Sequence, residues 1–535
     1  MSHPQNSHSK NIAQVTETPP SSMADVIPAD PDDRENCLLE QATIMDHSTP
    51  SSEIIAIAQE AAACGPIAED RVIATIARSC RIPKSSIQQQ LRHLRDSGGV
   101  DDRDQLRHAE DYLIETGRQN LITTVEGTWS WSGSVWRRLD QTELHRQVAH
   151  YLRPRLEAVS DRDVTGVSAM ITKLAYRPDQ TWEQGPADSV NTPTGEITYV
   201  DGSWQCLPHQ REHYRTIQIP VEWDPSAEAP TFSGYLDSLF QNDSDREEKS
   251  QLILELIGYT LMPHCRYQCA LFLYGQGSNG KSVLFRVLEV LLGTRNIASV
   301  QPSNFDSRFQ REHLSGKLAN IITEMKKGEV IPDDSFKALT AGESSTVEKK
   351  GNDPYDFRPF ATLWFAANYF PATRDHGFAF YRRIRVILLN NFFRDSDPKT
   401  DPDLPEKLMK ELPGILRMSL EAYGAAIDRG SITDPSSSKK ARHEWFLETN
   451  QTAQFAEECL QNCQGGKIES RKIYKTYREW ANAVGIGPSR VLSEKGFSQQ
   501  MQDLGYTRHR LSNARYFLEI DLTNDGRKYA PKVIF

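Results

Sequence analysis

The spacing of apolar positions changes along the chain and divides it into segments. Residues 1–52 have only scattered apolar residues among Ser, Pro, Asp and Gln, so they bury too little surface to offset chain entropy. We expect a disordered acidic tail there. Residues 53–100 have apolar residues at helical spacing with a break at Pro83, which predicts two short helices around a tight turn. This segment is helix-turn-helix-like, and DNA contact and a merely structural hairpin are both open for it.

The remaining patterns predict an α/β protein of several domains. Residues 105–250 mix helices with short strands, and residues 251–430 alternate apolar strands with helices, including an amphipathic helical stretch over 404–427. A polar linker is expected over 434–440. Residues 441–535 predict helices followed by a basic hairpin, a pattern typical of a winged-helix-like DNA-binding domain.

Length and composition narrow the class of protein. The 535 residues exceed one domain, and no apolar run approaches the roughly 18 residues of a membrane-spanning helix. The first residues have no secretory pattern, so we expect no membrane partner and a cytoplasmic location. Eight cysteines are too sparse for a disulfide framework, and Cys206, His209 and His213 lack a fourth metal ligand. We expect reduced thiols and ordinary histidines.

The charge is unevenly distributed. The net charge is −10, yet residues 1–60 alone have ten acidic residues against two basic ones. Residues 467–535 instead have thirteen Lys and Arg against seven Asp and Glu. Such a basic segment suits a nucleic-acid surface, and an ordinary solvated face is the alternative.

The strongest chemical signal is a glycine-rich run between an apolar strand over 269–274 and a helix over 283–292. In this context a P-loop turns its backbone N–H groups towards phosphate oxygens, while Lys281 reaches the β- and γ-phosphates and Ser282 ligates Mg²⁺. The run therefore predicts ATP and Mg²⁺ as cofactors. The expected nucleotide-binding residues are Gly275, Gln276, Gly277, Ser278, Asn279, Gly280, Lys281, Ser282 and Val283.

Two later strands end in polar residues that suit the same chemistry. The apolar run over 318–324 ends at Glu324, which we expect to activate water and to help hold the metal, although Thr323 stands where many ATPases have a carboxylate. The run over 361–367 ends at Asn368, whose amide could orient the attacking water. An ordinary exposed strand-end residue is the alternative for Glu324.

Two arginines after the last of these strands could complete hydrolysis. Arg383 is our first choice for an arginine finger that reaches the γ-phosphate in a neighbouring subunit, and Arg382 is the second. A surface ion pair is the alternative for either side chain.

The order of these features along the chain resembles the superfamily 3 helicases. The features are the glycine-rich loop, the acidic strand that ends at Glu324, Lys337–Gly342 leading to Glu348–Lys350, Asn368 and Arg382–Arg383. The likeness is to the poxvirus-type ATPase half of phage and plasmid primase-helicases. It implies an AAA+-like P-loop core over 251–430, a collar region over 105–250, and a ring, commonly a hexamer, with ATP between subunits. It also implies a hairpin over 346–360 in which Lys349 and Lys350 contact DNA phosphates, an assignment that basic loop tips favour. A plain solvated turn is the alternative for this segment. The part before residue 105 is too short for a primase domain, so a separate primase is an expected partner.

Together these features predict an ATP-dependent DNA helicase or translocase. It would act on single-stranded DNA and on fork or origin DNA during replication of a phage, plasmid or related element in a bacterial host cell. One alternative is a P-loop ATPase that remodels protein complexes. Another is a DNA-binding initiator or regulator that acts through residues 69–97 and 467–535 and uses ATP mainly for assembly.

Overall fold

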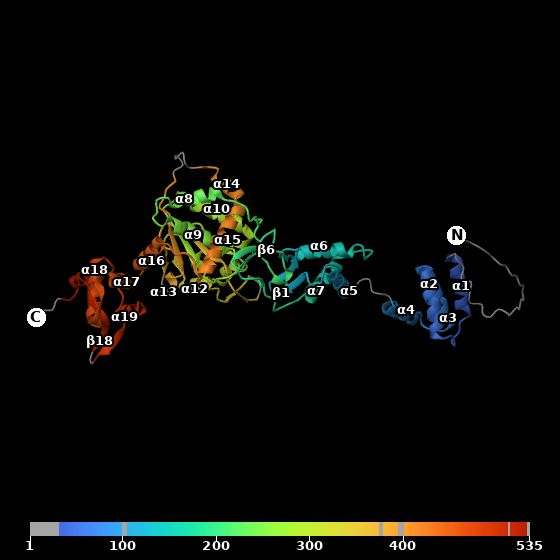
Figure 1. Ribbon diagram of the computed structural model, residues 1–535. Helices are drawn as coiled ribbons and strands as arrows, with labels where there is room; N and C mark the ends of the chain where they lie inside the picture. Colours follow the sequence, from blue (N-terminus) through green and yellow to red (C-terminus); the bar gives the residue numbers. More distant parts are fainter. Residues whose placement is uncertain are drawn as a thin grey trace, which may run out of the picture. The chain divides into compact units, whose positions relative to one another are not determined.

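The computed structural model describes residues 31–98, 104–351, 353–373, 378–393, 401–511 and 514–531. The chain forms two compact units. The first consists of residues up to 114 together with 144–174, and the second of residues 115–143 together with 175 onwards. Figure 1 labels most of the helices and a few of the strands of both units.

The first unit is helical. Its elements are α1 (Pro31–Ile44), α2 (Ser51–Ala63), α3 (Pro66–Ser79), α4 (Lys84–Gly98), α5 (Gln105–Glu115), α6 (Gln141–Leu152) and α7 (Asp161–Leu174). The predicted disorder over 1–52 is wrong for residues 31–52, because α1 buries Leu38 and Ala42 against α2 and α3. Few apolar residues suffice when neighbouring helices cover them. Residues 1–30 lie outside the described residues.

The segment over 53–100 contains three helices rather than the two expected. After α3 the chain turns at Arg81, whose φ is 59°, and Pro83 precedes α4. Ile87 and Leu91 on α4 are buried against the preceding helices. The turn and the second helix of the predicted pair are thus present, and DNA contact by α4 stays a prediction.

A five-stranded parallel sheet organises the second unit, which confirms the α/β class. Its strands are β7 (Ala270–Tyr274), β8 (Ile297–Ala298), β9 (Ala319–Ile322), β13 (Thr362–Ala367) and β15 (Ile384–Leu388). The spatial order is β15-β7-β13-β9-β8, and each neighbouring pair is parallel. Residues directly opposite each other include Ala367 and Tyr274, and Phe365 and Ile322.

Both faces of this sheet are buried, as expected for parallel strands. Alternate side chains point to opposite faces, so Leu271 and Leu273 join one apolar cluster while Phe272 joins another. Helices α8, α9, α10, α14 and α15 supply the first cluster, and α12, α13 and α16 contribute to the second. Figure 1 shows α8, α10 and α14 close together.

The helices around the sheet are α8 (Pro230–Phe240), α9 (Arg246–Thr260), α10 (Lys281–Leu292), α11 (Arg308–Arg311), α12 (Asp333–Ala341), α13 (Phe378–Tyr381), α14 (Leu404–Lys410), α15 (Leu412–Arg429) and α16 (Ser436–Thr449). The stretch over 404–427 is thus two helices, because Pro413 has no N–H to continue a helix and starts α15 instead. The predicted linker over 434–440 is wrong, since α16 begins within it and buries Ala441 and Trp445.

Smaller sheets complete the region before and beside the parallel sheet. They contain β1 (Leu121–Thr124), β2 (Gly127–Trp131), β3 (Trp136–Leu139), β4 (Ser189–Asn191), β5 (Glu196–Val200), β6 (Ser203–Leu207), β10 (Val330–Ile331), β11 (Ser345–Val347), β12 (Tyr355–Phe357) and β14 (Ala372–Thr373). Single-turn 3₁₀ helices occur at Arg211–His213, Thr294–Asn296, Pro302–Asn304 and Glu312–Leu314. The strand and turn pieces expected within 105–250 are therefore present.

The last part of the chain has its own core. Its elements are α17 (Gln451–Cys459), β16 (Leu460–Glu469), α18 (Ser470–Ala483), α19 (Glu494–Asp503), β17 (Arg508–Leu511), β18 (Ala514–Leu522) and α20 (Asn524–Lys528). The strands form an antiparallel sheet in the order β16-β18-β17. Tyr477, Trp480, Phe497 and Phe517 are buried within it.

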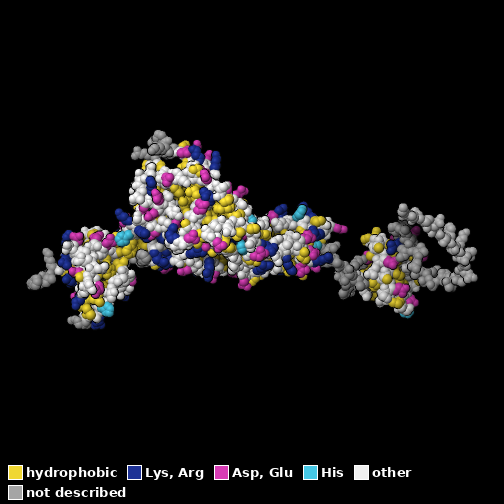
Figure 2. Space-filling view, viewed as in Figure 1, with side chains coloured by type: hydrophobic (Ala, Val, Ile, Leu, Met, Phe, Trp, Pro, Cys, Tyr) yellow, Lys and Arg dark blue, Asp and Glu magenta, His cyan; other side chains and the backbone are white. Residues whose placement is uncertain are grey.

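The surface mixes both signs of charge. On the face seen in Figure 2, Lys and Arg side chains are interspersed with Asp and Glu. Within the described ranges, no helix has the length and apolar character needed to cross a membrane.

Candidate active site at the carboxyl edge of the sheet

Three neighbouring strands end at one edge of the parallel sheet, and β13 ties the segments that follow them together. The N–H of Gly275, after β7, donates to the carbonyl of Ala367, and the N–H of Met325, after β9, donates to the carbonyl of Ala366, both at 3.2 Å. Asn368 follows β13 directly. Since adjacent strands lie about 4.8 Å apart, the ends of β7 and β9 are about 10 Å apart. The loop, Glu324 and Asn368 therefore share this edge.

The glycine-rich loop, Gly275–Ser282, has backbone angles that favour glycine. Gly277 has a φ of 102° and Gly280 a φ of 83°, while Ser278 adopts 45°. A Cβ on residue 280 would lie 2.5 Å from Leu239 Cδ2, so a larger residue would also clash there. The loop leads into α10, whose N-cap is Gly280. The predicted order of strand, loop and helix is thus present.

Lys281 is held by its own loop. Its Nζ donates to the Gly275 carbonyl at 2.6 Å and to Asn279 Oδ1 at 2.9 Å. Burial lowers the pKa of this ammonium group, because desolvation disfavours the charged form. Asn279 is buried, and its Nδ2 has no hydrogen-bond partner among the described residues.

The loop's donors fit a phosphate chain. Within the described chain, the backbone N–H groups of residues 276–280 donate to no other group. The backbone N–H groups of Lys281 and Ser282 lie in the first turn of α10, where no preceding helical turn provides a carbonyl to accept them. Unpaired N–H groups at a helix N-terminus favour anions. Ser282 and Glu324 are exposed at this edge and provide oxygen ligands of the kind that Mg²⁺ prefers, alongside phosphate and water.

The acidic residue and the amide are accessible. Thr323, Glu324 and Asn368 are all exposed where they follow β9 and β13. Tyr369 lies beside them, and burial together with Glu329 and Glu324 raises the pKa of its hydroxyl. Its Oη has no hydrogen-bond partner in the described chain.

The two arginines differ sharply in exposure, which favours Arg382 over our first choice, Arg383, for a role at the surface. Arg383 is 8% exposed, and its Nη1 donates to the Ala379 carbonyl at 2.5 Å, so it packs inside the chain. Arg382 is exposed, and its Nη2 donates to Gln268 Oε1 at 3.3 Å. Both precede β15, so about 16 Å of strand separates them from the loop's edge of the sheet. Of the two, only Arg382 has an exposed side chain, and it lies at the edge of the sheet opposite its own loop.

The predicted basic hairpin is present. Strands β11 and β12 pair antiparallel, with Thr346 opposite Asp356. Lys349 and Lys350 are exposed in the turn between them. Residue 352 lies outside the described residues.

Several contacts to the loop come from segments that the sequence did not single out. The Tyr235 hydroxyl donates to the Gly280 carbonyl at 2.8 Å. The Phe393 N–H donates to the Ser278 carbonyl at 2.6 Å. The same segment is fixed to α8, because the Asn391 side chain donates to carbonyls of that helix. The spacing of apolar residues does not reveal such contacts. The sequence did offer one signal, since two amide side chains, Asn390 and Asn391, follow the apolar run over 384–389.

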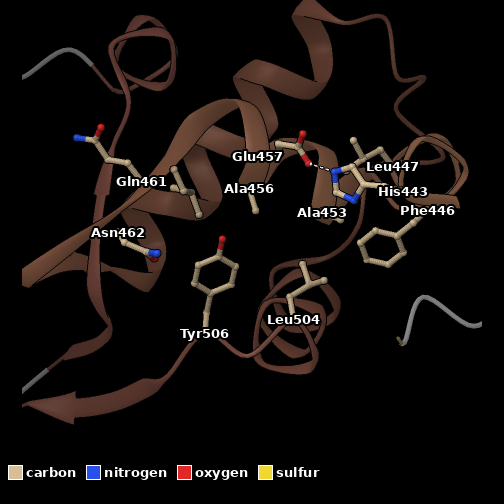
Figure 3. A pocket seen from close by; sticks show the side chains of 11 residues that line it. His443, Phe446, Leu447, Ala453, Ala456, Glu457, Gln461, Asn462, Leu504 and Tyr506 are labelled. Carbon is tan, nitrogen blue, oxygen red and sulfur yellow. Dashed lines mark hydrogen bonds and ion pairs between the residues drawn. The ribbon is translucent and has the colours of Figure 1, made fainter. Parts of the chain in front are cut away.

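A separate pocket of about 450 Å³ lies among α16, α17, β16 and the turn after α19. Figure 3 shows that its wall includes the pair of His443 Nε2 and Glu457 Oε2, 2.7 Å apart, with Tyr506 facing the cavity. It contains none of the residues predicted for nucleotide chemistry. No cluster of three or more potential metal ligands among His, Cys, Asp and Glu occurs in the described ranges.

Two family models match parts of the chain. Residues 110–241 match a family described as D5 N terminal like, and residues 273–383 match a family of unknown function (DUF5906). The second match runs from within β7 to the arginine pair, and so contains the loop, Glu324 and Asn368.

Curated relatives are viral proteins. "Putative helicase 121R" of Invertebrate iridescent virus 3 is 30% identical over 155 residues, 26% of this chain and 16% of that protein. "Putative helicase 022R" of Frog virus 3 is 24% identical over 236 residues, 40% of this chain and 24% of that protein. "Putative helicase L207/L206" of Acanthamoeba polyphaga mimivirus is 23% identical over 294 residues, 48% and 29% respectively.

The chain has a D5-like segment and viral relatives named as helicases. It spans less than a third of the length of each of these relatives. Their names point to viruses of invertebrates, frogs and Acanthamoeba, which do not support the bacterial host expected above. Among solved structures, the apo C-terminal region of NrS-1 aligns with a TM-score of 0.47 and 12% identity, covering 78% of this chain and 100% of that one.

Proposed function

We propose that the protein is an ATP-driven DNA helicase or translocase of the superfamily 3 type that acts in replication. The observation that carries this proposal is the shared edge of the parallel sheet, where the glycine-rich loop, Glu324 and Asn368 follow adjacent strands. Ligands of open α/β sheets bind outside the carboxyl ends of the strands. The viral relatives named as helicases agree with this class of activity.

The loop binds the triphosphate, which is the substrate. Backbone N–H groups of residues 276–282 surround the phosphate oxygens, and Lys281 exchanges its bonds to Gly275 and Asn279 for the β- and γ-phosphates. Ser282 and Glu324 would hold Mg²⁺, which supplies charge neutralisation for the phosphates. Glu324 accepts a proton from the attacking water, and the Asn368 amide orients that water.

Arg382 completes the site of an adjoining subunit. Its position before β15 separates it from its own loop by the length of that strand, while its exposure lets it extend outwards. A ring, expected to be a hexamer, would put each Arg382 against the neighbouring nucleotide. Hydrolysis would then depend on assembly.

Lys349 and Lys350 grip single-stranded DNA through its phosphates. They lie in an exposed turn between two short strands, a place where cations contact a backbone without reading sequence. The hairpin follows α12 and precedes β13, so it is joined directly to the strand that leads to Asn368. A movement of Asn368 on nucleotide hydrolysis would therefore shift the hairpin and the DNA that it holds.

The outer regions recruit the motor to its substrate. Helices α18 and α19 followed by the β17–β18 hairpin support our proposal of a winged-helix-like domain, and α18 presents exposed Arg471, Lys472, Lys475 and Arg478. We assign it contact with origin or fork DNA. The region over 105–250 serves as the collar, and a separate primase supplies primers.

The test compares Lys281→Ala with Arg286→Ala in the full chain. Arg286 is an exposed cation on the same helix, so it controls for a loss of positive charge. We expect Lys281→Ala to abolish phosphate release and strand unwinding, and Arg286→Ala to retain both. Retained hydrolysis in Lys281→Ala would overturn the assigned site.

Single-stranded DNA decides between the proposal and its rivals. We expect it to stimulate phosphate release and, with ATP, to increase the assembly's size in light scattering. Hydrolysis that DNA leaves unchanged favours a protein-remodelling ATPase. Sequence-specific duplex binding with negligible hydrolysis favours a DNA-binding regulator that uses ATP for assembly.

A further inference from the structure

A conspicuous exposed aromatic side chain lies next to the glycine-rich loop. Phe392 is 61% exposed, against 49% for Tyr176 and for Phe309. Single exposed apolar side chains are common on protein surfaces, so the position of Phe392 beside the loop matters more than its exposure alone.

Phe392 belongs to the segment over 389–393, which follows β15 and runs along the loop. The N–H of Leu389 donates to the Tyr274 carbonyl at 2.8 Å, which continues the pairing of β15 with β7. At the other end, the N–H of Phe393 donates to the Ser278 carbonyl at 2.6 Å. Consecutive Cα atoms are 3.8 Å apart, so Phe392 lies within one residue of a direct contact with the loop.

Both neighbours of Phe392 are fixed. The Asn391 side chain donates to the carbonyls of Ser238 and Leu239 on α8, at 2.8 and 3.0 Å. Its Oδ1 accepts from Asn242 Nδ2 at 2.7 Å. Phe393 is tied to the loop by its N–H and packs partly into the core. The backbone at Phe392 is therefore held between two anchored residues, so a ligand that meets the ring has little backbone left to order.

We propose that Phe392 stacks on the base of the nucleotide whose phosphates the glycine-rich loop binds. This inference rests on the proposed function and adds a residue that binds the nucleoside. A base is flat and apolar on its faces, and stacking on an aromatic side chain is the usual way proteins hold it. Since every base has such a face, the contact gives affinity for nucleotides over bare polyphosphate rather than a strict choice of base.

The test measures binding of ATP and of inorganic tripolyphosphate to the full chain by calorimetry. Tripolyphosphate has the phosphates but no base, so it reports on the loop alone. We expect Phe392→Ala to weaken ATP binding by about tenfold and to leave tripolyphosphate binding unchanged. Phe392→Trp should restore ATP affinity, and its indole fluorescence should change when ATP is added but not when tripolyphosphate is added.

Phe309→Ala is the matched control. Phe309 is 49% exposed on α11, in the connection between β8 and β9 at the other side of the sheet, and its loss should change neither affinity. Unchanged ATP binding in Phe392→Ala, or an equal loss for both ligands, would overturn the stacking role. If the unaltered chain binds neither ligand, the nucleotide site itself fails. If the unaltered chain binds ATP and tripolyphosphate equally well, the phosphate-binding role of the loop is supported and only the base contact is refuted.

Discussion

The parallel sheet and the C-terminal region over 450–531 are both built around buried aromatic side chains, yet they place their polar residues differently. At the sheet, the candidate residues follow strand ends, and backbone hydrogen bonds to Ala366 and Ala367 draw them to one edge. In the C-terminal region, the cations are spread over α18, the β17–β18 hairpin and several other elements, outside the core. The sheet fixes the positions of its candidate residues relative to one another, whereas the C-terminal region only gathers positive charge on its surface.

This difference indicates which of the two proposed functions, phosphate chemistry or DNA attraction, tolerates amino-acid substitutions better. Chemistry on a phosphate requires donors at fixed places, so the sheet must keep its strand order and its glycines. Attraction to a DNA backbone depends on the number of nearby cations and falls with salt. Substitutions in the two regions should therefore differ in size and in kind.

Among exposed side chains, the largest effect is expected from Arg382→Ala. If this side chain acts as a finger on a neighbouring subunit, its loss should reduce kcat by about 10³-fold, the lower end for such residues, with folding unchanged. Arg383→Ala should instead lower the thermal unfolding temperature, because that side chain is buried. Steady-state kinetics and thermal unfolding on both variants separate the two roles. Equal loss of turnover without destabilisation in Arg383→Ala would reverse the assignment.

Core truncations should separate the two regions. Trp364 is buried in β13 and its Nε1 donates to Thr260 Oγ1 at 3.0 Å, while Trp480 is buried in α18. Replacing either with Ala should cost about 4 kcal/mol of its own region's stability. Trp364→Ala should also abolish nucleotide binding, because β13 holds the loop and Asn368. Trp480→Ala should leave DNA-independent hydrolysis intact, and loss of that hydrolysis would show that the regions are not independent.

A smaller effect is expected from Gly280→Ala. The positive φ costs about 1–2 kcal/mol for a residue with a Cβ, and the clash with Leu239 adds to it. We expect at least a tenfold loss of ATP affinity in calorimetry. Gly505→Ala is the control in the C-terminal region, since its φ of 93° is similar but no atom lies within 4 Å of the added Cβ. It should destabilise slightly and leave ATP affinity as it is.

The smallest effect is expected from single surface cations of the C-terminal region. Arg510→Ala removes an exposed guanidinium from β17 and should weaken DNA binding only a few fold at moderate salt. The slope of log affinity against log salt should fall by about one. Titrations at several salt concentrations, with Gln499→Ala on α19 as an uncharged control, measure this. An unchanged slope would show that Arg510 does not contact the DNA.

Local sequence predicted much of the architecture because strand and helix periods are short-range properties. The strand before the loop, the helix after it, the strands ending near Glu324 and at Asn368, and the hairpin with Lys349 and Lys350 all occur where expected. The errors came from tertiary contacts. Helix α1 is stabilised by its neighbours despite a polar composition, and α16 begins in a polar stretch because Trp445 packs on the sheet.

The sequence by itself determined the glycine-rich loop between its strand and helix, because that motif is contiguous and its chemistry depends on residue types at fixed spacing. Only the tertiary structure decided the strand order that brings Glu324 and Asn368 beside the loop, and the burial that separates Arg383 from Arg382. It alone also set Phe392 next to the loop, more than a hundred residues away along the chain. Pairing between distant strands and burial depend on the whole folded chain, so no local pattern could have supplied them.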